Sequence, residues 1–396
     1  MSTLIEVHLI QNHAPSNLNR DDTGSPKEAF FGGVKRARIS SQCLKRTIRR
    51  SEMFQTALAG NLGTRTRQLP EEIRKAFESD PELKPYAEVA AKKASGFGTK
   101  DGKERDADPK SGKFLTAQTM FLTPADIEAV AEVLKKAARE SKNLAAFEKL
   151  TAKDLQSQAQ AKGFRPISVD VALFGRMVTS EALRDVEACC QVAHPISTHK
   201  IAHEFDYFTA VDDLQGLSEA EGEEDSGADM IGDVEYNSAC YYKYLSLDLD
   251  GLVDNLTGKK LQEVTEESLA SAKELAKKTI AAMVEAAVMT TPSGKQNTFA
   301  AHQLPAAVLV EVRPVKTPIS YANAFVDPVR AGKDGKDLVT GSLTAFGEHV
   351  AALTDGFNLK TSKRLLLAPL HKDWSIEGTE KVKSLAALLS ALDEAL

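Results

Sequence analysis

Three segments of this chain have the composition and alternation of β-strands, and helical segments separate them. The strand-like segments are TLIEVHLIQ at residues 3–11, VEYNSACYYKYLSL at 234–247 and PAAVLVEVRP at 305–314. A helical pattern covers residues 40–50, and a long Ala-rich one covers 266–289. Strand, helix, strands, helix and strand in this order are typical of a ferredoxin-like sheet. We therefore predict an α+β fold whose sheet is interrupted by insertions.

Two insertions interrupt the predicted sheet. Residues 58–165 contain short Lys-, Glu- and Ala-rich helical patterns around the loop SGFGTKDGKERDADPKSGK. Residues 204–233 contain eleven acidic residues and no basic one, which indicates a segment surrounded by solvent. The chain has 396 residues and 42% apolar content, enough for two or three compact units with their own cores.

Composition narrows the classes of function. No run of 18 apolar residues is present, so we expect no membrane span, and the first residues lack the pattern of a signal peptide. The four cysteines fit neither metal-ligand spacing nor a disulfide framework, so we expect reduced thiols in a cytoplasmic protein. A formal net charge of −6 argues against a general nucleic-acid coat. Any nucleic-acid contact must therefore be local.

One stretch contrasts with this acidic average. Residues 27–50, KEAFFGGVKRARISSQCLKRTIRR, hold eight Lys or Arg residues and one acidic residue, Glu28. The predicted helix, with Ser40 or Ser41 as N-cap, has no acid in its first turn. An acid there would stabilise the helix by roughly 0.3–1 kcal/mol. Free N–H groups, serine hydroxyls and nearby cations together suit a bound phosphate.

Helical spacing gives this helix two faces. Gln42, Lys45 and Arg49 are spaced i, i+3, i+7 and share one face. Leu44 and Ile48 lie on another face, which can be buried. The helix can therefore pack on a core and present cations to a row of phosphates. A surface helix with solvated charges and a contact with an acidic protein remain alternatives. Further cations extend the basic stretch: Arg20, Lys27, Lys35 and Arg38.

Two loops carry further chemical possibilities. The loop TTPSGKQNTFA presents Lys295 and backbone amides that suit phosphate contacts, but it lacks the P-loop signature and is equally typical of a plain turn. Asp21 and Asp22 suit either a carboxylate pair for phosphodiester chemistry or turn formation beside Arg20.

A histidine-rich stretch and an aromatic stretch follow one another. His199 and His203 lie near His194, but no helix-borne HExxH motif is present, so we favour packed or exposed histidines over a metal site. The segment FDYF at 205–208 has three aromatics. Its composition favours core packing, whereas on a protrusion the aromatics and Leu214 would act as wedges between bases or in a partner's groove.

Six blocks of the sequence, taken in order, resemble the backbone subunit of the type I-E CRISPR Cascade, the CasC family. The blocks are NLNRDDTGSPKEAFFGGVKRARISSQCLKRTIRRS, DVALFGRM, QVAHPISTH, EFDYFTAVDDL, GADMIGDVEYNSA and PSGKQNTFA. The resemblance extends over nearly the full length and is weakest in the middle insertion and after about residue 330.

The resemblance implies a palm with a modified ferredoxin-like, RNA-recognition-motif-like sheet, a helical fingers insertion and an extended thumb. The implied palm consists of residues 1–57, 166–193 and 232–330, with C-terminal palm-associated helices at 331–396. The implied fingers are residues 58–165, and the implied thumb is residues 194–231.

The resemblance also implies a function in antiviral defence. Identical, non-catalytic copies would form a helical filament along CRISPR RNA (crRNA), together with other Cascade subunits. They would present the guide in segments for pairing with double-stranded target DNA, and a recruited nuclease-helicase would act on the complex. Neither a cofactor nor a metal ion is implied. The alternatives are a nuclease using Asp21 or Asp22 and a protein-only scaffold.

Individual roles follow from the same resemblance. In the thumb, Tyr207, Phe208 and Leu214 would wedge against the guide–target duplex. Lysines of the fingers loop would touch DNA or remain solvated, and these are Lys100, Lys103 and Lys113. The residues expected to contact RNA are Asn17, Arg20, Lys27, Ser40, Gln42, Lys45, Arg49, Met177 and Lys295.

Overall fold

The computed structural model describes residues 3–160, 167–177, 183, 185–210, 230–258 and 264–396. The chain divides into two compact units, and each is described separately. No helix in the described ranges combines the length and apolar content that crossing a membrane requires. Unit 1 comprises Met1–Phe54, Val192–Ser246 and Ala281–Leu396, and unit 2 comprises Gln55–Gln191 and Leu247–Ile280.

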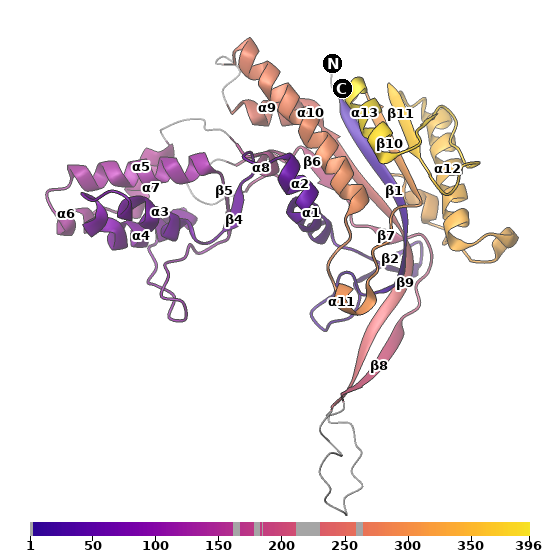
Figure 1. Ribbon diagram of the computed structural model, residues 1–396, viewed down its shortest axis with the longest axis horizontal. Coiled ribbons are helices and arrows are strands. Elements are labelled where there is room, and N and C mark those ends of the chain that lie inside the picture. Colours follow the sequence, from indigo (N-terminus) through magenta and orange to yellow (C-terminus); the bar gives the residue numbers. More distant parts are fainter. Residues whose placement is uncertain (1–2, 161–166, 178–182, 184, 211–229, 259–263) are drawn as a thin grey trace, which may run out of the picture. The chain divides into compact units, whose positions relative to one another are not determined.

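Unit 1 is built on a mixed β-sheet. Its path of strands runs in the order β12-β11-β10-β1-β9-β6, and β7 and β8 also pair with β9. β10 is antiparallel to both β1 and β11, whereas β11 and β12 are parallel. Figure 1 shows β1 beside β10. The strands are β1 (Leu4–Ser16), β6 (Cys190–Val192), β7 (Ile196–Ser197), β8 (Glu204–Ala210), β9 (Met230–Asp248), β10 (Ala307–Arg313), β11 (Lys363–Leu367) and β12 (Glu380–Lys381).

Both faces of this sheet are covered, which explains why β1 and β10 are almost wholly buried. On one face, Ile10 and Leu309 of the sheet form a core with Leu343 and Phe346 of α12 (Leu338–Phe357). The opposite face carries α1 (Ser41–Arg50) and the end of α10 (Glu266–Met289). There, one small cavity is lined by Leu9, Leu44, Ile48, Leu245 and Ala287.

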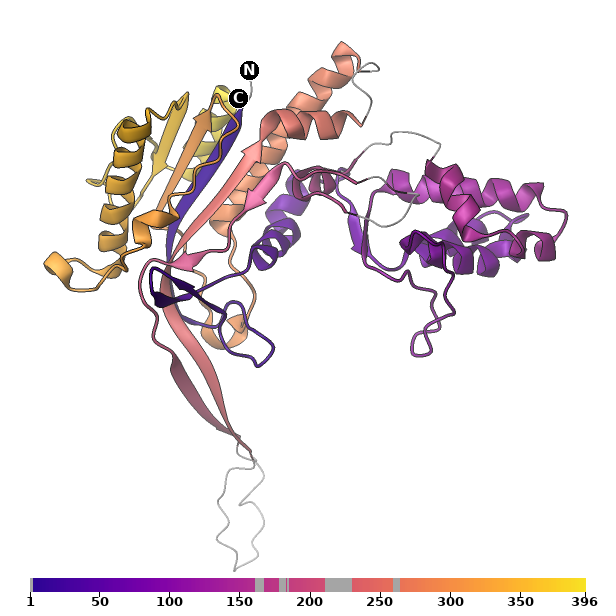
Figure 2. The same ribbon diagram turned by 180° about the vertical axis from the view of Figure 1, so that it is seen from behind.

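Smaller elements complete unit 1. A hairpin of β2 (Glu28–Phe31) and β3 (Val34–Ala37) precedes α1, and α11 (Gln296–Phe299) follows α10. β8 and β9 extend side by side as a two-stranded ribbon (Figure 2). The remaining elements are the 3₁₀ turns η4 (Ala322–Phe325) and η5 (Lys333–Gly335) and the last helix, α13 (Leu385–Ala395).

The predicted strands and helices of unit 1 are confirmed, with one omission. The strands expected at 3–11, 234–247 and 305–314 correspond to β1, β9 and β10, and the long helix spans the predicted 266–289. We expected only helices after residue 330. The chain instead also adds β11 and β12 to the sheet there, because the short apolar run at Lys363–Leu367 pairs with β10.

Unit 2 is mostly helical. The chain enters it through α2 (Glu52–Ala57), and its two short strands, β4 (Thr64–Thr66) and β5 (Met120–Leu122), are antiparallel. It also includes the first part of α10. Its other elements are α3 (Leu69–Glu78), η1 (Lys84–Tyr86), α4 (Ala87–Ser95), η2 (Gly96–Gly98), α5 (Pro124–Glu140), α6 (Leu144–Glu148), α7 (Ala152–Gln160), α8 (Val169–Phe174) and α9 (Leu249–Thr257).

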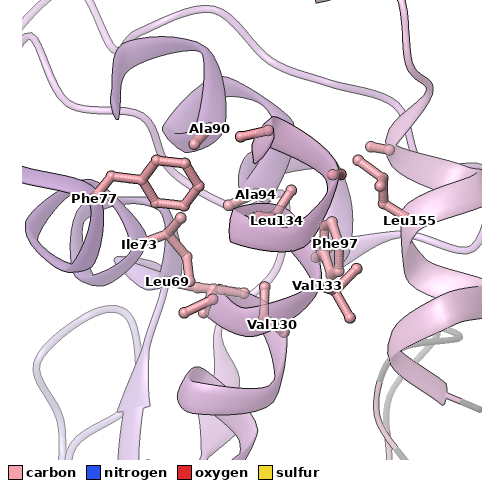
Figure 3. Packing of buried hydrophobic residues seen from close by; sticks show 14 of the residues in the cluster. Leu69, Ile73, Phe77, Ala90, Ala94, Phe97, Val130, Val133, Leu134 and Leu155 are labelled. Carbon is pink, nitrogen blue, oxygen red and sulfur yellow. The ribbon is translucent and has the colours of Figure 1, made fainter. Parts of the chain in front are cut away.

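An apolar core holds the helices of unit 2 together (Figure 3). Ile73 and Phe77 of α3 lie in one cluster with Ala94 of α4, Leu134 of α5 and Leu155 of α7, all of them buried. The predicted helical insertion thus has a core of its own. The structure also groups the described residues between 167 and 191, and those between 247 and 280, with this unit, whereas we expected them in the palm.

The core of unit 2 can be tested with two leucines. Leu134 is fully buried, so Leu134→Ala removes packed methyl groups. We expect the free energy of unfolding of unit 2 to fall by about 2–5 kcal/mol. The matched change at exposed Leu144 should alter stability by about 0.5 kcal/mol or less. Urea denaturation followed by circular dichroism measures both. Equal effects of the two substitutions would contradict the assigned core.

Candidate nucleic-acid interface

Helix α1 combines a buried apolar face with an outer basic face. Leu44 and Ile48 are buried, as the spacing predicts. On the outer face Gln42 is exposed, and Lys45 and Arg49 are half-buried. Burial of the two apolar side chains therefore turns these polar side chains outward.

The N-terminus of α1 is capped by Ser40. The Ser40 hydroxyl accepts a hydrogen bond from the Cys43 amide at 3.3 Å, and the Ser40 amide donates to Asn19 Oδ1 at 2.8 Å. Ser40 is buried in this role. No acid occupies the first turn, so the amides of Ser41 and Gln42 lie at the positive end of the helix without a compensating carboxylate.

Several cations come together around Lys27, which lies in the loop before β2. Burial raises the pKa of the Cys43 thiol, and the positive charges of Lys27 and Arg46 oppose this shift. The pKa of His194 is lowered by burial and by Arg38 and Lys27. Lys27 therefore lies within electrostatic range of Cys43 on helix α1, and its carbonyl oxygen accepts a hydrogen bond from the Arg38 amide at 2.8 Å. We call the exposed and half-buried residues of this region the basic surface: Arg20, Lys27, Arg38, Gln42, Lys45, Arg46, Arg49 and Arg50.

The loop between β1 and β2 is held by a buried amide. Asn17 is fully buried, and its Nδ2 donates to the carbonyl oxygens of Gly24 at 3.0 Å and Glu235 at 2.9 Å. Arg20 in the same loop is exposed. Of these two residues predicted to contact RNA, Asn17 thus fixes the loop to β9, and Arg20 faces outward.

Asp21 forms a turn in this loop. Its Oδ1 accepts hydrogen bonds from the Thr23 amide at 2.9 Å, the Thr23 hydroxyl at 2.8 Å and the Ser25 amide at 3.0 Å. The Thr23 hydroxyl is the main cause of its lowered pKa. The oxygen Oδ1 is therefore committed to the turn, which agrees with the turn-former interpretation.

One arginine of the basic stretch faces inward. Arg36 is fully buried, and its guanidinium donates to the backbone carbonyls of Phe31, Ser197, Phe325 and Val326 at 2.7–3.3 Å. Arg36 therefore ties the β2–β3 hairpin to the rest of unit 1 and does not add to the basic surface. The sequence pattern gave no sign of this role.

The loop that carries Lys295 lies against the Asn17 loop. A Cβ added to Gly294 would lie 2.6 Å from the carbonyl oxygen of Asn17 and 2.4 Å from that of Leu18. Only glycine allows this approach. Lys295 follows with a φ of 50° and is half-buried. The structure therefore brings the predicted contact loop next to the basic surface, although about 270 residues of sequence separate them.

The aromatics of FDYF are exposed on the β8–β9 ribbon, so the interpretation as core residues is wrong. Alternation along β8 places Phe205 and Tyr207 on one face and Phe208 on the other. Tyr207 is 69% exposed, and Phe208 is 39% exposed because its ring lies over Gly232 on the paired strand. Period-2 alternation would have identified Phe205 as a third exposed aromatic. Leu214 and the acidic tip at 219–229 lie outside the described residues.

Met177 and the fingers lysines belong to unit 2. Met177 is 91% exposed and follows Arg176, whose Nη1 donates to Asp126 at 2.5 Å. Lys100, Lys103 and Lys113 are exposed, the last two flanking a run of charged loop residues. The structure assigns these residues to a unit other than that of the basic surface.

The histidines of HPISTHKIAHEF are engaged within the protein. His199 is buried, its Nδ1 lies 2.9 Å from the Lys200 carbonyl, and its Nε2 accepts from the Cys240 amide at 3.1 Å. His203 pairs with Glu235. These contacts agree with the expectation of packed or exposed histidines.

A different buried group has the composition of a metal site but the contacts of an ion-pair network. Glu6, His8 and Glu311 lie close together. Glu311 pairs with Arg313 at 2.7 Å and with Arg364 at 2.7 Å. Burial opposes its ionisation, but His8 and the two arginines outweigh burial and lower the pKa of Glu311 to about 2. The arginines supply the positive charge that a metal ion would otherwise provide.

Comparisons with known proteins identify chains of similar fold. A search of curated proteins finds no match. A chain of a solved structure described as "CRISPR RNA-guided surveillance complex, pre-nicking" is 27% identical, with a TM-score of 0.76 and 99% of each chain covered. A chain of a second, "CRISPR RNA-guided surveillance complex", is 23% identical with a TM-score of 0.57 and 99% of each chain covered, and it supports the fold alone.

A protein-family model shows which family the chain belongs to. The model of the CT1975-like protein family matches residues 5–392, nearly the whole length. The resemblance to backbone subunits of CRISPR surveillance complexes, drawn from the sequence blocks, is thereby confirmed. This chain belongs to the CT1975-like protein family.

Proposed function

We propose that this protein is a non-catalytic, crRNA-binding backbone subunit of a type I-E Cascade complex. Identical copies polymerise along the guide RNA and present it in segments for pairing with invading double-stranded DNA. Other Cascade subunits complete the assembly, and a recruited nuclease-helicase acts on it. The solved structure that is 27% identical carries the description of an RNA-guided surveillance complex, which supports this proposal.

The single observation that carries the proposal is the two-faced helix α1. Its apolar side chains, Leu44 and Ile48, are buried, its first turn lacks acids, and its outer face carries Lys45 and Arg49. Cations and helix N-termini bind phosphates without reading bases. Such a surface suits a subunit that must accept any guide sequence, because base pairing then reads the target.

The palm is proposed to be a modified ferredoxin-like sheet of the RNA-recognition-motif type. The strand order β10-β1-β9-β6, with α1 after β1 and α10 between β9 and β10, supports this assignment. In this proposal β8 and the start of β9 belong to the thumb, and the helical unit 2 contains the fingers.

Two alternatives receive less support. A nuclease would need Asp21 or Asp22 to be available for a metal ion, but three donors from Thr23 and Ser25 occupy Asp21 Oδ1. A protein-only scaffold would need an acidic partner for the basic surface. To distinguish the scaffold from the RNA-binding subunit, the protein is purified without nuclease treatment and its RNA content is measured. A protein-only scaffold retains no RNA.

The basic surface can be tested through salt dependence. We expect Lys45→Ala to weaken binding of unrelated single-stranded RNAs to a similar extent and to reduce the salt slope of log affinity by about one unit. Fluorescence anisotropy of labelled RNA at several salt concentrations measures both quantities. Lys360→Ala, at an exposed site after α12, is the matched control and should leave the slope unchanged. A strong dependence of the Lys45→Ala effect on RNA sequence would contradict non-specific phosphate binding.

The ribbon aromatics can be tested separately from guide binding. We expect Phe208→Ala in the assembled complex to leave guide affinity nearly unchanged and to weaken pairing with target DNA, because an exposed ring stacks on bases. Electrophoretic mobility shift with complementary duplex DNA measures target binding. Thr209→Ala, at the next exposed position of β8, is the control. Loss of complex assembly in Phe208→Ala would show that the ring has a packing role instead.

The absence of catalysis is also a direct expectation. The assembled complex, incubated with Mg²⁺ and a paired target but without the recruited nuclease, should leave both strands intact. Gel analysis of end-labelled strands measures this. Cuts at regular spacing that disappear in Asp22→Asn but persist in Asp373→Asn, an exposed aspartate near the C-terminus, would establish the nuclease alternative.

A further inference from the structure

Phe30 is an exposed aromatic residue that none of the roles above includes. It lies in β2 and is 77% exposed. Glu28, Phe30 and Lys35 share one face of the β2–β3 hairpin, because Phe30 is opposite Lys35 in the register and Glu28 pairs with Lys35 at 3.0 Å. The other face carries Arg36, which is fully buried. Phe30 therefore points away from the core of unit 1.

The hairpin holds this ring on a rigid support. Gly32 and Gly33 form the turn with φ values of 60° and 78°, which suit a two-residue hairpin turn. A Cβ on Gly32 would lie 1.9 Å from the Val326 carbonyl oxygen, so the turn packs closely against that segment. Arg36 fixes the adjacent strand through four carbonyl oxygens. An exposed ring on such a support loses little conformational freedom when it binds a ligand.

The surroundings of Phe30 are charged and not apolar. Lys35 lies directly opposite, and the only carboxylate on this face, Glu28, is paired with Lys35 and lies 3.7 Å from His203. The strand begins next to Lys27 of the basic surface, and at about 3.3 Å per residue Phe30 lies about 10 Å further along. Arg38 donates to the Glu28 carbonyl at 3.0 Å. A single exposed ring that lies beside charged side chains and near the basic surface is typical of a single-stranded nucleic-acid site, whereas a protein contact favours neighbouring apolar side chains.

We propose that Phe30 is a stacking platform for one unpaired base of the RNA whose phosphates lie on the basic surface. This inference rests on the proposed function. It adds a contact to a base, whereas the basic surface contacts only phosphates. Because every base has a π-face, stacking on Phe30 does not select a sequence. It fixes the position of a base along the guide without limiting which guide can bind.

Tryptophan fluorescence tests the proposal in the full-length chain. Phe30→Trp places a reporter at the site, and Phe357→Trp places one at another exposed phenylalanine, at the end of α12. The wild type, with its single tryptophan, gives the background. We expect poly(U) RNA to quench the added fluorescence of Phe30→Trp and not that of Phe357→Trp. Inorganic polyphosphate, which has no bases, should bind without this quenching.

Affinity provides the second measurement. Since stacking on an aromatic side chain contributes about 1–3 kcal/mol per base, Phe30→Ala should weaken RNA binding about fivefold or more and leave the affinity for polyphosphate unchanged. Phe30→Trp should retain wild-type RNA affinity. Anisotropy of labelled RNA and competition by polyphosphate measure these affinities.

The outcomes separate this inference from the proposed function. RNA binding without quenching in Phe30→Trp, together with wild-type affinity in Phe30→Ala, would overturn the stacking role and leave the proposed function intact. Reduced self-association of Phe30→Ala in sedimentation, with RNA affinity unchanged, would identify a protein contact and would also overturn it. If the wild-type chain binds no RNA, the proposed function fails, and the stacking role fails with it.

Discussion

Burial of Leu44 and Ile48 against the central sheet is the contact on which the interface depends. These two side chains, with Leu9, Leu245 and Ala287, surround one small cavity under α1. Burying a Leu or Ile side chain contributes about 1.5–3 kcal/mol each, more than the cost of a few cations near a helix N-terminus. Burial of the apolar face therefore fixes the rotation of α1 about its axis. The cations on its other face consequently point outward. The packing residues and the basic residues of α1 thus occupy different faces of the helix.

The interface is assembled from segments that are distant in sequence and fixed by residues that do not face solvent. Asn17 bonds the first loop to Glu235 of β9, Arg36 bonds the hairpin to Ser197 and to Phe325, and Gly294 lets the third segment approach the first. Buried polar groups favour a single arrangement, because any other arrangement would break their hydrogen bonds. A substitution at one of these positions would displace the basic surface as a whole. In a binding assay it would weaken RNA binding as the loss of a contact residue does, although the substituted residue does not contact RNA.

Much of the fold followed from patterns that are local in sequence. The period of α1 predicted its two faces, and the Ala-rich run predicted the bounds of α10, because helical spacing and burial depend on neighbours within the same helix. The burial of Arg36 and Asn17 was not predictable, since each bonds to a partner more than 150 residues away, Arg36 to Ser197 and Asn17 to Glu235. Composition alone favoured a core for Tyr207 and Phe208, whereas the resemblance implied an exposed position in the thumb, and the pairing of β8 with β9 places them on a ribbon. Strand β11 depended in the same way on its partner, β10.

Photo-crosslinking tests the central claim, that RNA lies across α1 and the loops beside it, most directly. RNA containing 4-thiouridine would be bound to the full-length chain, irradiated, and digested, and the crosslinked peptides would be identified by mass spectrometry. The account predicts crosslinks within residues 17–50 and around Lys295, in proportion to RNA occupancy and independent of the RNA sequence. Crosslinks confined to the helices of unit 2, with none between residues 17 and 50 at full occupancy, would contradict it.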